Sequence, residues 1–203
     1  MTTLDEVAER LSRYRPPSGR TVAPVRAAVA LCLQERPEGL EVLFIERARC
    51  DGDPWSGHLA FPGGRIDPGD ADPRAAAERE TLEEVGLDLA RARYLGTLGS
   101  HHAERLPVVV SCFVYGLGGD PVLRPNHEVA SAFWVPLAHL VDPARHLVKT
   151  FRFGGKDWAH PAIQLLGPGR PVLWGITYRL VERFCRAMGL AFPAARSEGA
   201  AAP

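Results

Sequence analysis

The segment that most constrains the fold is a short acidic helix that follows a loop rich in glycine, proline and aspartate. The helix is predicted over ADPRAAAERETLEEVG, with Asp72 as N-cap, a proline at the first helical position and Gly86 as the stop. Within it, Glu80, Glu83 and Glu84 stand at positions i, i+3 and i+4. All three carboxylates therefore project from one face of the helix.

Clustered carboxylates of this kind repel one another on an isolated helix. One interpretation is a solvated acidic face, and the other is a site where a cation offsets the repulsion. Ligands that are all oxygen select a hard ion, Mg²⁺ or Mn²⁺, over zinc. Arg79 can reach Glu83 at i+4 and orient it. Gly63 and Gly64 allow the backbone to approach a ligand, and a carbonyl at Gly64 can complete the coordination.

The string RETLEEVGL and the glycine upstream of it resemble the signature of the Nudix hydrolase family. That signature is Gly, five residues, Glu, seven residues, then Arg-Glu, an apolar residue, any residue, Glu-Glu, any residue, Gly and an apolar residue. Two positions differ from it: Asp70 replaces the early Glu, one residue further from Arg79, and Thr81 replaces an apolar residue. The matching positions are Gly64, Arg79, Glu80, Glu83, Glu84, Gly86 and Leu87.

The resemblance implies a hydrolase that uses Mg²⁺ or Mn²⁺ to cut a diphosphate joining a nucleoside to another group. It also implies an α+β fold in which a mixed β-sheet lies between helices. Three further strings are similar to the coenzyme A pyrophosphatases of this family: GHLAFPGG, Arg47-Ala48 and WGIT at 174–177. The basic residue expected between Arg47 and Gly57 is not evident. Because of the three similar strings, coenzyme A or an acyl-CoA is expected ahead of ADP-ribose, a dinucleotide or a nucleoside triphosphate as the substrate.

The resemblance carries a set of roles onto this sequence. Glu80, Glu83, Glu84 and Gly64 are expected to hold the metal, and Arg79 belongs with the catalytic group. The general base varies in position within the family, so Glu80, Glu104 and Glu128 are all candidates, with Glu128 taken forward as catalytic. His101 and His102 share a loop with Glu104 and are either solvated or in contact with substrate.

Phosphate and base contacts are less constrained by the sequence. Arg47, Arg49 and Arg65 flank the expected site and are candidates to bind substrate phosphate, against the default of solvated arginines. Trp55 and Trp134 can stack a nucleobase, but both lie in apolar surroundings that favour packing.

The rest of the chain reads as a single α+β domain over 25–189, preceded by a helix and lead-in at 1–24 and followed by a disordered tail at 190–203. Terminal helices are expected at 4–14 and 171–189. Strands are expected at 25–33, 40–48, 94–100, 106–117, 127–137 and 146–153.

Composition excludes several classes of protein. Lys plus Arg (24) equals Asp plus Glu (24), so there is no basic excess for nucleic acid. No apolar run long enough for a membrane span and no secretory signal are present, which predicts a cytoplasmic protein. The four cysteines lack metal-ligand spacing, so reduced thiols are expected and a zinc hydrolase is not. The expected partner is a small nucleotide; a homodimer stays open. A non-catalytic Nudix sensor domain would lack intact glutamates.

Overall fold

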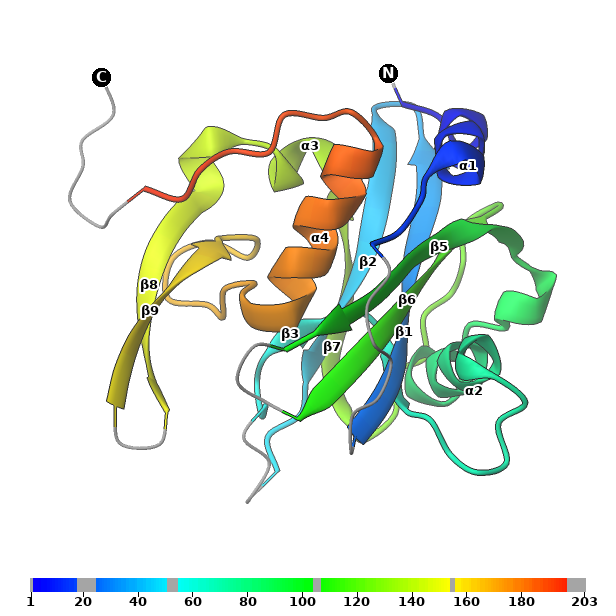
Figure 1. Ribbon diagram of the computed structural model, residues 1–203, viewed down its shortest axis with the longest axis horizontal. Helices are drawn as coiled ribbons and strands as arrows, with labels where there is room; N and C mark the ends of the chain where they lie inside the picture. The colour runs from blue at the N-terminus through cyan, green and yellow to red at the C-terminus, as the bar shows by residue number, and fades with distance from the viewer. Residues whose placement is uncertain (1, 18–24, 51–54, 104–106, 154–155, 197–203) are drawn as a thin grey trace.

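The computed structural model describes residues 2–17, 25–50, 55–103, 107–153 and 156–196 (Figure 1). Its centre is a sheet in the order β3-β2-β1-β6-β5, to which β4 is added beside β1 and β7 beside β2. β1 and β6 are parallel and every other pair in this sheet is antiparallel, so the sheet is mixed. The strands are β1 Val25–Arg36, β2 Gly39–Arg47, β3 Leu59–Ala60, β4 Gly63–Arg65, β5 Arg93–His102, β6 Val108–Leu117 and β7 Val129–Pro136.

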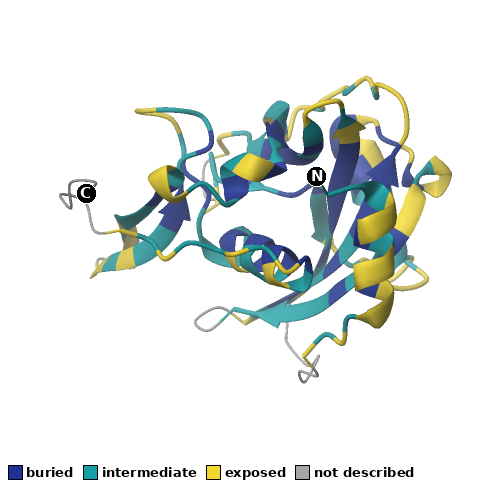
Figure 2. Ribbon diagram, turned by 90° about the horizontal axis from the view of Figure 1, so that it is seen from above, coloured by how far each residue is buried: buried dark blue, intermediate teal, exposed yellow. Residues whose placement is uncertain are grey.

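Alternate side chains of the sheet enter two separate cores. Leu31 and Leu33 of β1 pack with α1 (Leu4–Arg13) and α4 (Gly175–Ala187) on one face. Ala30 and Cys32 pack with α2 (Pro73–Val85) on the other. This follows from the two-residue period of a strand, and it explains why β1 reads as an uninterrupted apolar run. Buried residues therefore run along both faces of the sheet (Figure 2), and the predicted α+β sheet between helices is confirmed.

The acidic helix begins and ends where the sequence predicts. The Asp72 carboxylate accepts a hydrogen bond from the Ala75 N–H at 2.8 Å, and Gly86 closes the helix with φ of 73°. The helix is fixed to β6 by Tyr115, whose buried hydroxyl donates to Glu78 at 2.8 Å. Thr81, at a position that is apolar in the family signature, is buried and donates to the Ala77 carbonyl.

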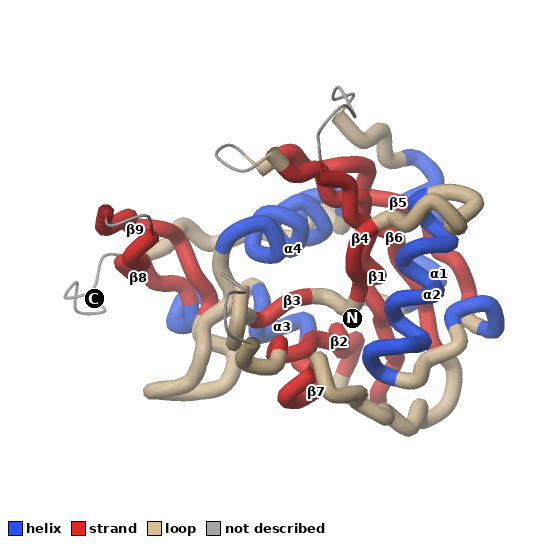
Figure 3. The backbone as a smooth tube through the Cα atoms, turned by 90° about the horizontal axis from the view of Figure 1, so that it is seen from below, coloured by secondary structure: helices blue, strands red, loops and turns tan. Residues whose placement is uncertain are grey.

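A two-stranded hairpin, β8 (His146–Phe153) with β9 (Lys156–Ile163), lies apart from the main sheet. Helix α4 lies between the hairpin and that sheet (Figures 1 and 3). Isolated bridges tie Ile163 to Leu173 and Leu147 to Arg196. Of residues 190–196, expected within a disordered tail, Arg196 pairs with Leu147 of β8, whereas 197–203 lie outside the described residues.

The predicted strands and terminal helices are present. The short strands β3 and β4, strand β9, the short helix α3 (Leu137–Leu140) and two 3₁₀ turns at Leu89–Arg91 and Pro143–Arg145 were not predicted. Cys32, Cys112 and Cys185 are buried and Cys50 is exposed, and all four are free thiols. In the part of the chain that the structure describes, no helix is both long and apolar enough to cross a membrane.

Candidate active site

The glycines at 63 and 64 lie where β1 and β2 diverge. β1 pairs with β2 only at its far end, over 33–36, and the segment 59–65 fills the place between the two strands. Gly63 has φ of 143°, and a Cβ there would stand 2.3 Å from the Ala28 carbonyl oxygen. A Cβ on Gly64 would stand 2.4 Å from the carboxyl carbon of Glu80. Only glycine fits at position 63, because the backbone there passes directly over β1, whereas a side chain at position 64 would have to displace the Glu80 carboxylate.

Glu84 is the most enclosed carboxylate of the acidic helix, with 2% of its surface exposed. Its Oε2 accepts a hydrogen bond from the Gly63 N–H at 2.8 Å. Burial raises the pKa of Glu84 to about 7, and the carboxylates of Glu80 and Glu128 add to the rise. The Gly63 N–H and the Arg47 guanidinium lower it in part. Residues from α2, the end of β2, the start of β4 and the turn before β7 therefore all act on the Glu84 carboxylate.

Glu80 is half-buried and, like Glu84, has its pKa raised by burial. The neighbouring Arg79 opposes that rise through a hydrogen bond, while Glu83 and Glu128 reinforce it. Two adjacent carboxylates on one helix face thus resist ionisation together. Withdrawal from water is the main cause for both residues, and the neighbouring negative charges add to it.

Arg79 links the acidic helix to the acidic loop before it, the segment 66–72 that carries Asp67 and Asp70. Its guanidinium donates to both oxygens of Asp70, from Nε at 2.9 Å and from Nη2 at 3.0 Å. Its Nη1 donates to Glu80 at 3.0 Å and to Glu83 at 3.1 Å. The two-pronged contact lowers the pKa of Asp70, and the surrounding acids raise the pKa of Arg79. Asp70 therefore reaches the glutamates through Arg79.

The donors fit a hard divalent cation in chemistry and charge. Glu80, Glu83 and Glu84 offer oxygen ligands only, and burial raises the pKa values of Glu80 and Glu84, a cost that a bound cation would relieve. Among the described residues, no three His, Cys, Asp or Glu side chains are already gathered as a metal cluster. The reason is visible in the contacts: Arg79 engages Glu80 and Glu83, and Gly63 engages Glu84.

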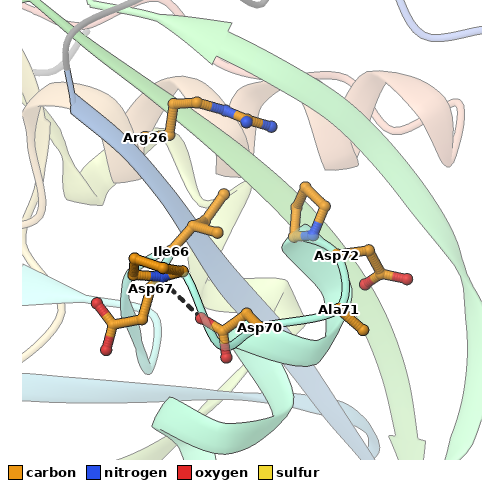
Figure 4. A pocket seen from close by; sticks show the side chains of 8 residues that line it. Arg26, Ile66, Asp67, Asp70, Ala71 and Asp72 are labelled. Carbon is orange, nitrogen blue, oxygen red and sulfur yellow. Dashed lines mark hydrogen bonds between the residues drawn. The ribbon is translucent and has the colours of Figure 1, made fainter.

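A hollow beside the acidic loop does not belong to this group of glutamates (Figure 4). Asp70 faces it but is held by Arg79, and Asp72 caps α2. In Figure 4 the dashed line joins the Asp67 N–H to Asp70, a hydrogen bond of 2.7 Å that shapes the turn. The hollow is lined by Arg26, Ile66, Asp67, Pro68, Asp70, Ala71, Asp72 and Pro73.

Glu128 lies at the C-terminal end of the acidic helix. Its N–H donates to the Asn126 side chain at 2.8 Å, and the Asn126 N–H donates to the Glu84 carbonyl at 2.9 Å. The Arg124 N–H donates to the Val85 carbonyl at 2.8 Å, so this segment caps the helix. Sequence reasoning missed Arg124 and Asn126, because backbone capping by a distant segment leaves no local pattern. The Glu128 carboxylate itself is exposed.

The other predicted residues fall in different places. The Arg47 guanidinium lies close enough to Glu84 to lower its pKa. The Arg65 carbonyl accepts a hydrogen bond from Arg79 at 3.2 Å. The side chains of Arg65 and Arg49 are exposed. The Nδ1 of His101 lies 3.4 Å from Arg183 of α4, on the other face of the sheet from α2. Glu104 lies outside the described residues.

The predicted tryptophans differ in exposure, and His102 ends β5. Trp134 packs against the core on the α2 side, whereas Trp55 is 39% exposed. His102, like His101, belongs to strand β5 and not to a loop.

The sequence is similar to a known domain family and to known proteins. A NUDIX domain model matches residues 24–153. An uncharacterized protein of Schizosaccharomyces pombe is 35% identical over 187 residues, covering 75% of this chain and 57% of that protein. The mitochondrial coenzyme A diphosphatase NUDT8 of Homo sapiens is 35% identical over 176 residues, covering 84% of this chain and 69% of that protein. The chain thus spans little more than half of the first relative's length and about two thirds of the second's.

A solved structure shows the same fold. The MutT/nudix family protein from Enterococcus faecalis superposes with a TM-score of 0.54 at 19% identity, covering 91% of this chain and 69% of that one. The domain match, the human relative and the intact glutamate helix agree with one another: the chain belongs to the Nudix hydrolase family.

Proposed function

We propose that this chain hydrolyses the diphosphate of coenzyme A or an acyl-CoA, releasing 3′,5′-ADP and the matching 4′-phosphopantetheine. The observation that carries the reaction type is the buried Glu84 carboxylate, held by the Gly63 N–H beside Glu80 and Glu128. The choice of coenzyme A is supported by the identity to the human coenzyme A diphosphatase. The strings GHLAFPGG, Arg47-Ala48 and WGIT support it further.

Glu80, Glu83, Glu84 and the Gly64 carbonyl are proposed to hold Mg²⁺ or Mn²⁺. A divalent ion at such a site neutralises phosphate oxygens and lowers the pKa of a bound water. Arg79, held by Asp70, positions Glu80 and Glu83 from the side of the loop. Because these side chains contact Arg79 through only one oxygen each, the other oxygen of each carboxylate remains for a ligand.

Glu128 is proposed as the general base, with Glu80 as the alternative. Its carboxylate is exposed to water yet close enough to Glu80 and Glu84 to affect their pKa values. It would take a proton from the attacking water as the new P–O bond forms and the P–O–P bridge breaks. If Glu128→Gln lowers kcat at least about a hundredfold, the role stands. If only Glu80→Gln does so, Glu80 is the base.

Arg47, Arg49 and Arg65 are proposed to contact the substrate phosphates. Arg47 has the best support, since its guanidinium already acts on Glu84. A bidentate arginine suits a diphosphate oxygen pair and is not replaced by lysine without loss. We expect Arg47→Lys to raise KM more than Arg65→Lys does.

One comparison tests the substrate. The value of kcat/KM for coenzyme A, dephospho-CoA, ADP-ribose and a dinucleoside polyphosphate should be measured with Mg²⁺ and then with Mn²⁺. We expect coenzyme A to be cleaved best. An advantage of about tenfold for ADP-ribose or the dinucleotide, equal to about 1.4 kcal/mol in the transition state, would overturn the substrate and leave the general hydrolase. A catalytically silent domain would cleave none of them.

A further inference from the structure

The β8–β9 hairpin carries an aromatic face with one cation on it. Phe151 lies directly opposite Trp158, and Lys149 lies directly opposite His160. Directly opposed residues of an antiparallel pair share a face, and so do residues two apart on one strand. Lys149, Phe151, Trp158 and His160 therefore occupy one face of the ribbon. Among the described residues, Lys149 forms no ion pair.

This face meets the start of helix α4 at Trp174. The rings of Phe151 and Trp174 are stacked, with centroids 3.8 Å apart and planes 14° from parallel. His160 lies 5.5 Å from Trp174, and His58 approaches the same ring edge-on at 4.9 Å. Four rings from separate segments thus form one cluster, and none of them is fully buried. Core aromatics of this chain, such as Phe44 and Phe61, are enclosed almost completely.

The glycines next to His58 and Trp174 are not packed against other segments of the described chain. Gly57 and Gly175, the chain neighbours of these two residues, have φ of 72° and 68°. A Cβ built on either glycine meets no atom within 4 Å. The backbone on either side of the ring cluster is therefore uncrowded at these two glycines.

The cluster is joined to the catalytic residues by a short, hydrogen-bonded segment. The Arg47 N–H donates to the His58 carbonyl at 3.0 Å, and the Gly57 N–H donates to the Arg47 carbonyl at 3.1 Å. From His58 the chain runs through β3 to Gly63, at most about 17 Å of extended backbone. A ligand with its diphosphate at the glutamates can therefore place its far end on the hairpin face.

We propose that this face binds the 3′-phosphoadenosine half of the substrate, with the base stacked in the Trp174 cluster and the 3′-phosphate paired with Lys149. The inference rests on the proposed function and assigns to it a subsite. A ring stack accepts a purine through its π-face, and a phosphate monoester carries close to two negative charges that call for a cation. Lys149, 92 positions beyond Gly57, thereby supplies a positive charge in place of the basic residue that the resemblance leads us to expect between Arg47 and Gly57, where this chain carries only Arg49.

The test measures binding without turnover. Isothermal titration of 3′,5′-ADP and of 5′-AMP, in EDTA, should be compared for the full chain and four variants. Lys149→Gln is matched by Arg152→Gln, which removes one positive charge from the same strand but from the opposite face. Trp174→Leu, which removes the ring, is matched by Trp174→Phe, which keeps one.

We expect Lys149→Gln to weaken 3′,5′-ADP about tenfold while leaving 5′-AMP within about twofold, and Arg152→Gln to change neither ligand. Trp174→Leu should weaken both ligands about tenfold or more, with binding largely rescued in Trp174→Phe. Equal losses in the two charge variants would overturn the phosphate contact. Equal losses in the two Trp174 variants would reduce the ring to a packing role. If Trp174→Leu fails to fold, the Lys149 and Arg152 pair still decides the phosphate contact.

The experiments distinguish a failure of the proposed function from a failure of the proposed subsite. If none of the diphosphates is hydrolysed, the proposed function is wrong, and the titrations still report whether the face binds 3′,5′-ADP. If coenzyme A is hydrolysed but its advantage over dephospho-CoA survives in Lys149→Gln, the function stands and the subsite is wrong.

Discussion

The buried carboxylate of Glu84 accepts its hydrogen bond from the backbone of Gly63, 21 positions earlier in the chain. This contact joins the last turns of the acidic helix to the glycine pair wedged between β1 and β2. Neither part would be stable in this geometry without the other. The helix alone would carry three carboxylates that repel one another, and the glycine segment alone would have an unpaired N–H. The site is therefore formed by the fold as a whole.

Removing the charge at Glu84 should abolish activity and leave the fold intact. Glutamine keeps the shape and still offers an oxygen to the Gly63 N–H, but it loses the anionic ligand. We expect Glu84→Gln and Glu83→Gln each to lower kcat by orders of magnitude at saturating Mg²⁺. Glu78→Gln, on the same helix, is the matched control, because Glu78 accepts from Tyr115 and Arg74. It should lower the melting temperature and spare kcat; near-normal turnover in Glu83→Gln or Glu84→Gln would refute their assignment as ligands.

The same substitution should stabilise the metal-free protein. Burial and two neighbouring carboxylates disfavour the charged form of Glu84, and a neutral amide avoids that cost. In EDTA at pH 8 we expect Glu84→Gln to melt at a higher temperature than the unmodified chain. Adding Mg²⁺ should then raise the melting temperature of the unmodified chain more than that of the variant. Equal Mg²⁺ shifts in the two proteins would mean that the ion binds elsewhere.

A side chain at Gly64 should displace the Glu80 carboxylate, whereas Gly69 should accept a side chain without effect. A Cβ on Gly64 would stand 2.5 Å from both Glu80 oxygens, but one on Gly69, in the neighbouring acidic loop, meets nothing within 4 Å. Gly64→Ala must displace the Glu80 carboxylate, so we expect kcat to fall at least about tenfold with a weaker Mn²⁺ affinity. Gly69→Ala should match the unmodified chain in both. A Gly64→Ala enzyme with normal Mn²⁺ affinity would show that Glu80 is not a ligand.

The acidic helix could be predicted closely from sequence because its signals are local. The cap at Asp72, the stop at Gly86 and the spacing of the glutamates all lie within one short stretch. Strand β9 could not be predicted in the same way: KDWAHPAI contains a proline and alternates weakly, and it is a strand because β8 pairs with it. The pair of hydrogen bonds from Arg79 to the Asp70 carboxylate depends on how an irregular loop folds back onto the helix. The spacing of residues along the sequence does not determine that path.

The two hydrogen bonds from Arg79 to Asp70 lead to a prediction about Asp70. Because Asp70 acts on the glutamates through Arg79, its loss should misplace them without removing a ligand. We expect Asp70→Asn to lower kcat about tenfold, well short of the effect of Glu84→Gln. The double variant Asp70→Asn with Arg79→Lys should cost little more than Arg79→Lys alone, since the two residues act as a unit. Additive losses in this cycle would mean that Asp70 has a role of its own.

The last prediction concerns His146, which joins β8 to the C-terminal segment. Its ring lies buried between Tyr178 and Phe192, with centroids 6.3 Å and 4.9 Å away, and its Nε2 lies 3.0 Å from the Leu140 carbonyl. Burial lowers the pKa of His146 below its ordinary value of about 6.5. The unfolded chain therefore binds a proton more readily than the folded chain as the pH falls below about 6.5, so folding stability is lost as the pH falls through that window.

His146→Phe keeps an aromatic ring and removes the titration. We expect the variant to melt lower at pH 8, because it loses the contact with Leu140, but to lose less stability than the unmodified chain between pH 8 and 5.5. A difference of 1 kcal/mol corresponds to about 2–4 °C for a chain of this size. Comparing the two curves cancels other groups that titrate in this range, including Glu84. His127→Phe, at an exposed histidine, serves as the control and should retain the original slope; parallel curves for His146→Phe and the unmodified chain would show that His146 titrates equally in both states.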